Sequence, residues 1–210
     1  MILYDEPWLG KNDKLICFGD SITASPTGYV SILREKLKKM KINVVNAGRG
    51  GDKTPWALTR LQHDVIEAKP DAVSIYLGAN DSIIGRGRWA DEPTVPVEAY
   101  KSNLIWMVHL CRLAGISKLS ITPPAWRFEG DAYIEHGDIL TSYCLAAREA
   151  AAEMRTRFVP LDIAFAEEWA RHPGHTGLLL TTDGIHMTAR GNAMIADTML
   201  KAWNIKLGKN

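Results

Sequence analysis

The sequence lacks an excess of charge of either sign. Its 25 lysines and arginines nearly balance 24 aspartates and glutamates, which gives a formal net charge of +1. Proteins that bind nucleic acid or an anionic membrane surface through general electrostatics carry a basic excess. We therefore expect no nucleic-acid partner and no stable membrane association.

Long apolar runs are also missing. The best candidate, LIWMVHLCRLAGI, is too short for a membrane span and contains His109 and Arg112. The opening residues, MILYDEPWLGKND, are acidic and lack the basic segment followed by an apolar one that marks a secretion signal. These features predict a cytoplasmic protein.

Cysteine is scarce. Cys17, Cys111 and Cys144 are odd in number, far apart and embedded in apolar patterns. This spacing suits neither a disulfide framework nor a CxxC metal site. We interpret all three as reduced core residues.

Short apolar runs alternate with helical patterns along the 210 residues. Such alternation predicts a parallel sheet with helices on both faces, in one domain (1–210) whose first 13 residues precede the first strand. A helix is expected over 55–67, where Pro55 suits the first turn. Long loops are expected at 78–96 and 123–137, after strands, where open α/β sheets bind ligands. The expected strands are 14–19, 42–47, 71–77, 117–122 and 158–162.

Four polar stretches follow or flank these elements: GDS at 19–21, NAGRGGD at 46–52, LGAND at 77–81 and DGIH at 183–186. Each alone has an ordinary structural explanation, such as a turn, a tight glycine loop or a buried histidine. Together they supply the parts of an acyl-transfer site. Ser21 would be the nucleophile, His186 its base and Asp183 the acceptor that orients the base.

The remaining parts are hydrogen-bond donors for a tetrahedral intermediate. The backbone amides of Ser21 and Gly51 and the side-chain amide of Asn80 are available, and Asp20 is a supporting residue beside the nucleophile. In the common doubly wound order 2-1-3-4-5, the second and third strands flank the first. Their following loops, which carry Gly51 and Asn80, would then lie on either side of Ser21.

The stretches FGDSIT, NAGRGGD, LGAND and DGIHMTARG resemble the four blocks of the SGNH hydrolases, also called the GDSL esterase/lipase family. They occur in the family's order. The resemblance implies a flavodoxin-like three-layer α/β/α sandwich around a five-stranded parallel sheet of order 2-1-3-4-5. It also implies a Ser21–His186–Asp183 triad with Gly51 and Asn80 in the oxyanion hole, and no metal or organic cofactor. Ile22 stands where the family has leucine, a volume-conserving change.

Motifs of other functional classes are weak. Gly48-Arg49-Gly50 begins like a dinucleotide fingerprint, but Lys53 occupies the place of the required glycine. His172 and His175 flank a Pro-Gly turn without an obvious third metal ligand. No G-x-S-x-G elbow of the other serine-hydrolase fold is present.

Residues near the expected active face suggest the substrate. Trp56, Trp89 and Trp126 could form aromatic walls for sugar rings or acyl chains, or could simply pack in the rim or core. Arg49 could bind an anionic substrate group, or could simply be solvated like most surface arginines. Arg86, Arg88 and Arg127 share the same expected face.

We expect a serine esterase that removes small acyl groups from a small-molecule ester, with deacetylation of carbohydrates as the leading hypothesis. Thioesterase, lysophospholipase or acyltransferase activity at the same site stays open, as does a non-catalytic sugar- or lipid-binding module. The apolar residues of the N-terminal segment must pack either on the helices that cover the sheet or on another subunit, and we predict a homo-oligomer; they are Ile2, Leu3, Tyr4, Trp8 and Leu9.

Overall fold

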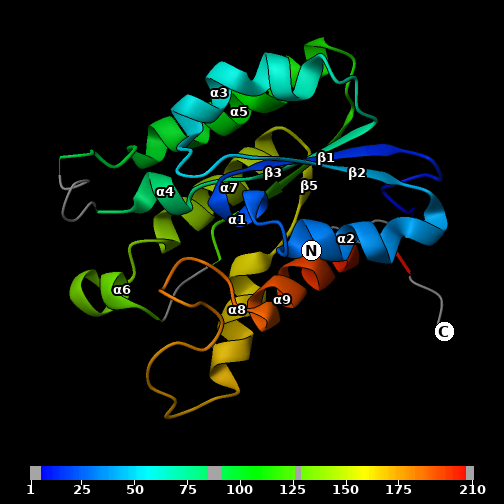
Figure 1. Ribbon diagram of the computed structural model, residues 1–210. Helices are drawn as coiled ribbons and strands as arrows, with labels where there is room; N and C mark the ends of the chain where they lie inside the picture. The colour runs from blue at the N-terminus through cyan, green and yellow to red at the C-terminus, as the bar shows by residue number, and fades with distance from the viewer. Residues whose placement is uncertain (1–5, 85–90, 126–128, 207–210) are drawn as a thin grey trace.

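The structure of the protein is a computed structural model, of which residues 6–84, 91–125 and 129–206 are described (Figure 1). Its five strands form one parallel sheet in the order β2-β1-β3-β4-β5, which confirms the fold and the strand order expected from the sequence. The strands are β1 (Lys14–Gly19), β2 (Asn43–Gly48), β3 (Ala72–Tyr76), β4 (Lys118–Thr122) and β5 (Arg157–Phe158). The helices are α1 (Ser21–Ala24), α2 (Tyr29–Leu37), α3 (Thr54–Leu61), α4 (Ala79–Ser82), α5 (Val97–Leu113), α6 (Asp131–His136), α7 (Thr141–Glu153), α8 (Leu161–Ala170) and α9 (Ala189–Ala202).

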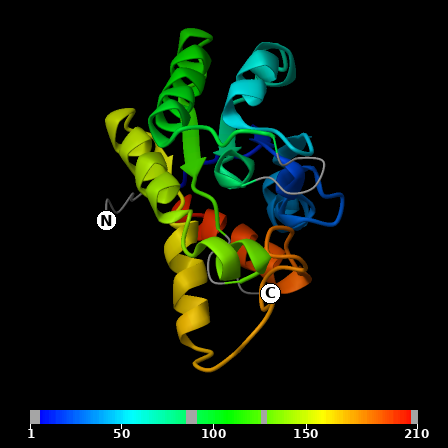
Figure 2. The same cartoon turned by 90° about the vertical axis from the view of Figure 1, so that its left-hand side faces the viewer.

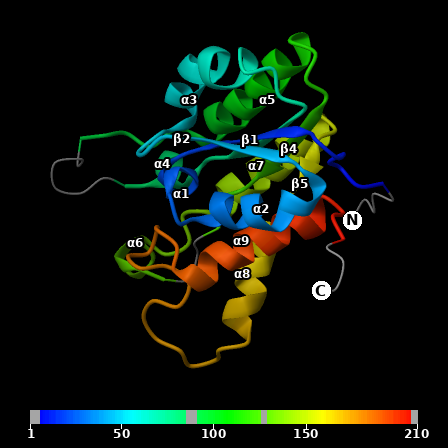
Figure 3. The same cartoon turned by 45° about the vertical axis from the view of Figure 1, so that its right-hand side comes forward.

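The central strands are covered on both faces. All of β3 and all of β1 after Lys14 are buried, as continuous apolar runs in a parallel sheet should be. Helices α3, α5 and α7 cover one face, and α2, α8 and α9 cover the other (Figures 1 and 3). The core on the first face includes Leu61 and Met107, and the core on the second includes Leu33 and Met199.

The register brings the ends of three strands together. Gly19 at the end of β1 pairs with Gly48 of β2 and with Tyr76 of β3. Because the strands are parallel, the loops that follow them leave from one edge of the sheet. Figure 2 views the molecule from this edge, where α4, α6 and the orange segment before α9 lie.

Some element boundaries differ from the expected ones. The run FVPLD was expected to be a strand over 158–162, but β5 ends at Phe158 and α8 begins at Leu161. Pro160 between them has no N–H for a strand ladder and precedes the first helical turn. The expected helix 55–67 is α3 followed by a π-helical segment, Gln62–Ile66. Helices α4 and α6 occupy parts of the two segments expected to be loops.

The described part of the N-terminal segment packs on its own chain. Trp8 and Leu9 are buried, and the Trp8 N–H donates to the Trp203 carbonyl at 2.9 Å. The Trp8 and Trp203 rings lie 4.9 Å apart, at the C-terminal end of α9. These contacts account for Trp8 and Leu9 without a partner subunit, and the homo-oligomer stays a prediction. Among the helices described, none combines the length and apolar character needed to cross a bilayer.

Candidate active site

Ser21 stands at the carboxyl end of β1, as the first residue of α1. The turn into this helix is built by its neighbours. The Asp20 carboxylate accepts from the Ile22 N–H at 2.9 Å and so caps the helix. At Gly19 a Cβ atom would lie 2.5 Å from the Tyr76 carbonyl oxygen, so only glycine fits against β3. The Gly-Asp-Ser triplet therefore closes a strand and starts a helix with Ser21 at the junction.

Asp183 and His186 lie in the segment between α8 and α9, and His186 reaches Ser21. The His186 Nε2 atom is 3.1 Å from the Ser21 Oγ atom, across 165 residues of sequence. The His186 Nδ1 atom is 2.7 Å from Asp183 Oδ2. The other Asp183 oxygen accepts from the backbone N–H groups of Ile185 at 2.9 Å and His186 at 2.7 Å. The structure thus brings the three expected residues into one hydrogen-bonded chain.

Asp183 is held as a carboxylate. Its partial burial raises its pKa, but hydrogen bonds from the His186 ring and from the His186 and Ile185 N–H groups outweigh that effect. The net pKa shift of Asp183 is downward. An ionised carboxylate only accepts hydrogen bonds, so the proton of their bond belongs to His186 Nδ1, and Nε2 is left to accept from Ser21.

The segment that carries Asp183 and His186 is held by Glu129, a residue that the sequence motifs do not include. Glu129, from the segment after β4, is buried, and its carboxylate accepts from the backbone N–H groups of Leu179 and Leu180. Next to it, Gly130 and Gly184 touch backbone to backbone: a Cβ atom on Gly184 (φ +90°) would lie 2.8 Å from the Gly130 Cα atom. Two segments about 50 residues apart in sequence are therefore fixed together beside the His186 turn.

Gly51 and Asn80 lie on the neighbouring loops, as the strand order requires. Gly51 follows β2 with φ +79°, and a Cβ atom there would meet nothing within 4 Å. Asn80 lies in α4 after β3, and its Nδ2 atom donates to the Asp52 carbonyl at 3.0 Å. One side-chain hydrogen makes this bond, and Nδ2 has a second hydrogen for another acceptor. Gly51 and Asn80 are thus linked through the residue that follows Gly51.

Two buried carboxyl groups lie close to these loops. Burial raises the pKa of Asp20 to about 7, an effect that the nearby Asp81 charge increases and the Ile22 N–H opposes. Burial also raises the pKa of Asp81 to about 6, against hydrogen bonds from Thr54. Asp81 accepts from both the N–H and the hydroxyl of Thr54 at the start of α3. The edge that carries Ser21 is therefore rich in desolvated acids.

A third buried acid, Asp52, pairs with Arg60 of α3. Arg60 was not among the site residues expected from the sequence. A signal was present, because Arg60 shares a helix face with the buried Ala57 and Leu61, where an arginine is unusual.

The expected substrate-binding residues are only partly described. Trp56 is 46% exposed on the first turn of α3, and the Lys53 ammonium lies 5.5 Å from its ring centroid. Arg49 is exposed, 3.8 Å from Asp64. Trp89 and Trp126, with Arg86, Arg88 and Arg127, lie outside the described residues. A substrate role for this group stays a prediction.

In the described part of the chain, the cysteines and His172 form neither a disulfide nor a metal site. All three cysteines are buried and none forms a disulfide, and burial raises the pKa of Cys17 and of Cys111 to about 12, which disfavours their thiolates. His172 contacts Glu168 at 3.2 Å and Arg190 at 3.2 Å. In the described ranges, no group of three or more His, Cys, Asp or Glu side chains is placed to hold a metal ion.

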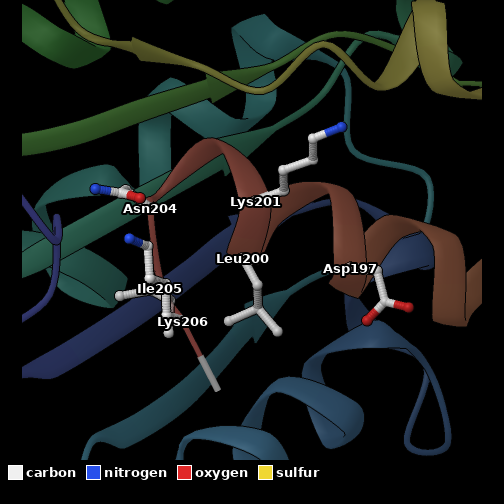
Figure 4. Close-up of a pocket in the computed structure, with 6 residues that line it drawn as sticks. All are labelled: Asp197, Leu200, Lys201, Asn204, Ile205 and Lys206. Atoms are coloured by element: carbon white, nitrogen blue, oxygen red, sulfur yellow. The ribbon is translucent and has the colours of Figure 1, made fainter. Parts of the chain in front are cut away.

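A shallow cavity of 320 Å³ lies at the other end of the molecule (Figure 4). It is lined by Asp197, Leu200, Lys201, Asn204, Ile205 and Lys206. These residues belong to the C-terminal part of α9 and the chain after it, whereas His186 lies just before the start of that helix. A 14-residue helix is about 21 Å long, so this cavity is separate from Ser21 and His186.

Comparison with known proteins places this geometry in a family. The sequence profile of the GDSL-like lipase/acylhydrolase family matches residues 17–194, a range that contains Ser21, Gly51, Asn80, Asp183 and His186. A GDSL esterase/lipase of Arabidopsis thaliana is 30% identical over 209 residues, which cover 90% of this chain and 85% of the plant protein. The isoamyl acetate-hydrolyzing esterase of Saccharomyces cerevisiae is 28% identical over 214 residues, or 90% of this chain and 85% of the yeast protein.

Solved structures agree with the sequence comparison. A catalytic mutant of an acetylxylan esterase from Geobacillus stearothermophilus, with a serine replaced by alanine, superposes with a TM-score of 0.83 at 25% identity. The match covers 96% of this chain and 99% of that one. A second catalytic mutant of the same esterase has an aspartate replaced. The chain belongs to the GDSL-like lipase/acylhydrolase family and is an esterase of the GDSL/SGNH type.

Proposed function

We propose that the chain hydrolyses carboxylic esters of small acyl groups, with acetyl groups on carbohydrates as the leading substrate class. The observation that carries the proposal is the unbroken path of hydrogen bonds from Ser21 Oγ through the His186 ring to Asp183. Such a path activates a hydroxyl for attack on an acyl carbon.

The proposed reaction has two halves. Ser21 Oγ attacks the ester carbonyl carbon while His186 Nε2 takes its proton, and Asp183 stabilises the imidazolium that forms. The tetrahedral intermediate collapses, and the alcohol leaves with the proton from His186. Water, deprotonated by the same nitrogen, then attacks the acyl-enzyme and releases the carboxylic acid and free Ser21.

Three donors are proposed for the oxyanion of this intermediate. They are the N–H of Ser21 at the start of α1, the N–H of Gly51 and the second Nδ2 hydrogen of Asn80. They come from the loops after β1, β2 and β3, which leave one edge of the sheet. Donors fixed in place before the reaction stabilise the developing charge without reorganisation, and such stabilisation is often the main source of an enzyme's rate enhancement.

The acyl group is inferred from the relatives. The yeast esterase acts on isoamyl acetate, and the Geobacillus esterase acts on acetylxylan. Their alcohols differ, but both substrates are acetate esters. The exposed Trp56 ring, on the helix that follows the Gly51 loop, offers an apolar face of the kind that packs on sugar rings.

Labelling with a fluorophosphonate tests the nucleophile. Mass spectrometry of the wild type should show one adduct, and peptide mapping should place it on Ser21. The Ser21→Ala variant should give no adduct. Ser31→Ala is the matched control, because Ser31 lies on α2 with its hydroxyl bonded to the Gly28 carbonyl. A wild type that takes no label, or labels elsewhere, would overturn the proposed mechanism.

A panel of esters tests the substrate class. Acetylated xylo-oligosaccharides and p-nitrophenyl acetate should be cleaved with higher kcat/KM than the butyrate and octanoate esters. A preference for octanoate would replace the proposal with a long-chain acyl substrate.

A further inference from the structure

Arg60 is the one charged residue of α3, and it is buried. Its side chain is 5% exposed, and it lies on the helix face that packs on the sheet. A guanidinium removed from water needs nearly all of its donors satisfied. The groups that accept hydrogen bonds from Arg60 therefore show which parts of the fold it holds in place.

Four acceptors surround the guanidinium. Nη2 donates to the Gly19 carbonyl at 2.8 Å, and Nη1 donates to the Ala47 carbonyl at 2.9 Å. Nε donates to the Asp52 carboxylate at 2.5 Å, and Nη1 also reaches the Asp64 carboxylate at 2.8 Å. The Phe18 ring lies under the guanidinium, 4.3 Å from its central carbon.

These acceptors lie next to the three proposed oxyanion donors. Gly19 is two residues before Ser21, and Asp52 directly follows Gly51. The Asp52 carbonyl in turn accepts from Asn80 Nδ2. The Arg60 guanidinium therefore holds the end of β1 and the end of β2. Through Asp52 it also holds the side chain of Asn80.

We propose that Arg60 is a positioning residue for the oxyanion hole, holding the Ser21 and Gly51 amides and the Asn80 side chain in a common geometry. The inference rests on the proposed function, because it assigns a task to donors that the function requires. Arg60 itself does not touch the ester; it acts through Gly19 and Asp52.

Lysine cannot replace this arrangement. The guanidinium is a planar fork that bonds to several acceptors in fixed directions, whereas an ammonium is a single point charge on a flexible stem. In an Arg60→Lys variant, one amine would have to serve the carbonyls of Gly19 and Ala47 and two carboxylates. The loops would keep their charge balance and lose their fixed spacing.

The expected effect falls on the chemical step. Oxyanion donors act within a few tenths of an ångström, and a misplacement of about 1 Å can cost on the order of 10²-fold in rate. We expect kcat of Arg60→Lys to fall by about 10²-fold while KM changes by less than about 3-fold. The rate of fluorophosphonate labelling of Ser21 should fall in parallel with kcat.

Arg148→Lys is the matched control. Arg148 also stacks on a phenyl ring, with Phe158 at 4.3 Å, and also pairs with a carboxylate, that of Asp162. It lies at the β5 edge of the sheet and not beside the β1 and β2 ends. Its kcat should match the wild type. Near-ultraviolet circular dichroism and the thermal midpoint establish that each variant is folded, and Arg60→Gln serves if the lysine variant is not.

A double-mutant cycle with Asn80→Ala tests the route of the effect. If Arg60 acts through Asp52 and Asn80, the fold-decrease in kcat of the double variant should be clearly smaller than the product of the fold-decreases of the two single variants. Strictly multiplicative losses, or an Arg60→Lys variant with wild-type kcat, would overturn the positioning role. A wild type that is not labelled on Ser21 would instead overturn the proposed function, so the two failures are distinguishable.

Discussion

The carboxyl group of Asp20 makes the stability of the fold depend on pH in a defined direction. Burial raises its pKa to about 7, against 3.8 for the free side chain. Between these values the folded protein keeps a proton that the unfolded chain releases. The folded state therefore binds more protons, and the free energy of unfolding falls as pH rises through this window.

The magnitude follows from the two pKa values. Ionising a group whose pKa is raised by about 3 units costs the folded state about 4 kcal/mol above pH ~7. At pH ~5 the unfolded chain has already released this proton, so part of that free energy is lost before pH ~5 is reached. We therefore expect the contribution of Asp20 to the free energy of unfolding to fall by about 2–3 kcal/mol between pH ~5 and pH ~8. Asp81, whose pKa is raised to about 6, contributes in the same direction. Only a comparison with a variant isolates Asp20.

Asp20→Asn is the appropriate variant, because asparagine keeps an oxygen that can accept from the Ile22 N–H and cannot ionise. Urea unfolding should show that, between pH ~5 and pH ~8, the free energy of unfolding falls by about 2–3 kcal/mol more in the wild type than in the variant. Asp197→Asn, at an exposed position on α9, is the control and should follow the wild type. Parallel losses for wild type and Asp20→Asn would refute a protonated Asp20 in the fold.

Three further substitutions test the site. Asn80→Ala should lower kcat by about 10²–10³-fold with little change in KM, since it removes one oxyanion donor, and steady-state kinetics with an unchanged kcat would exclude Asn80 from the hole. Asp183→Asn should lower kcat by on the order of 10³–10⁴-fold through the wrong His186 tautomer, and a pH–rate profile like that of the wild type would mean that another group orients the ring. Glu129→Ala leaves the Leu179 and Leu180 N–H groups without their acceptor, so urea unfolding should show a loss of about 2–4 kcal/mol; a loss below about 0.5 kcal/mol would show that water replaces the carboxylate.

Local patterns in the sequence, together with the resemblance to the SGNH hydrolases, were sufficient to predict the fold and to name the catalytic candidates. Alternating strands and helices predicted a parallel sheet, the common doubly wound order and the resemblance to the SGNH hydrolases supplied the order 2-1-3-4-5, and the structure has both. Ser21, Gly51 and Asn80 each follow a strand directly, so strand order alone placed them on one edge. Asp183 and His186 are three residues apart and share one turn, which is why their contact could be expected.

Other features depend on contacts that no local pattern contains. Glu129 bonds to Leu180 across 51 residues, and Arg60 bonds to Gly19 across 41. Nothing in the residues beside Glu129 distinguishes it from a solvated acid. The bounds expected for the fifth strand, 158–162, were wrong for a different and local reason: Pro160 ends the strand, which spans Arg157–Phe158, and α8 begins at Leu161.

The candidate catalytic residues lie on two separate parts of the fold. Ser21, Gly51 and Asn80 follow the ends of three neighbouring parallel strands, whereas Asp183 and His186 lie on a segment that joins two helices. The 3.1 Å contact between Ser21 Oγ and His186 Nε2 connects the halves, and a bond to an exposed hydroxyl contributes only about 1 kcal/mol. That bond cannot fix either half.

In each half, one buried ionisable side chain binds backbone groups from distant segments. Arg60 donates to the Gly19 and Ala47 carbonyls, and the Glu129 carboxylate accepts from two consecutive N–H groups before Asp183. Each side chain must keep these bonds, because a buried ionisable group without partners is costly. If Arg60 and Glu129 help to set the distance between Ser21 and His186, substitutions at either residue should lower kcat although Ser21, His186 and Asp183 are unchanged.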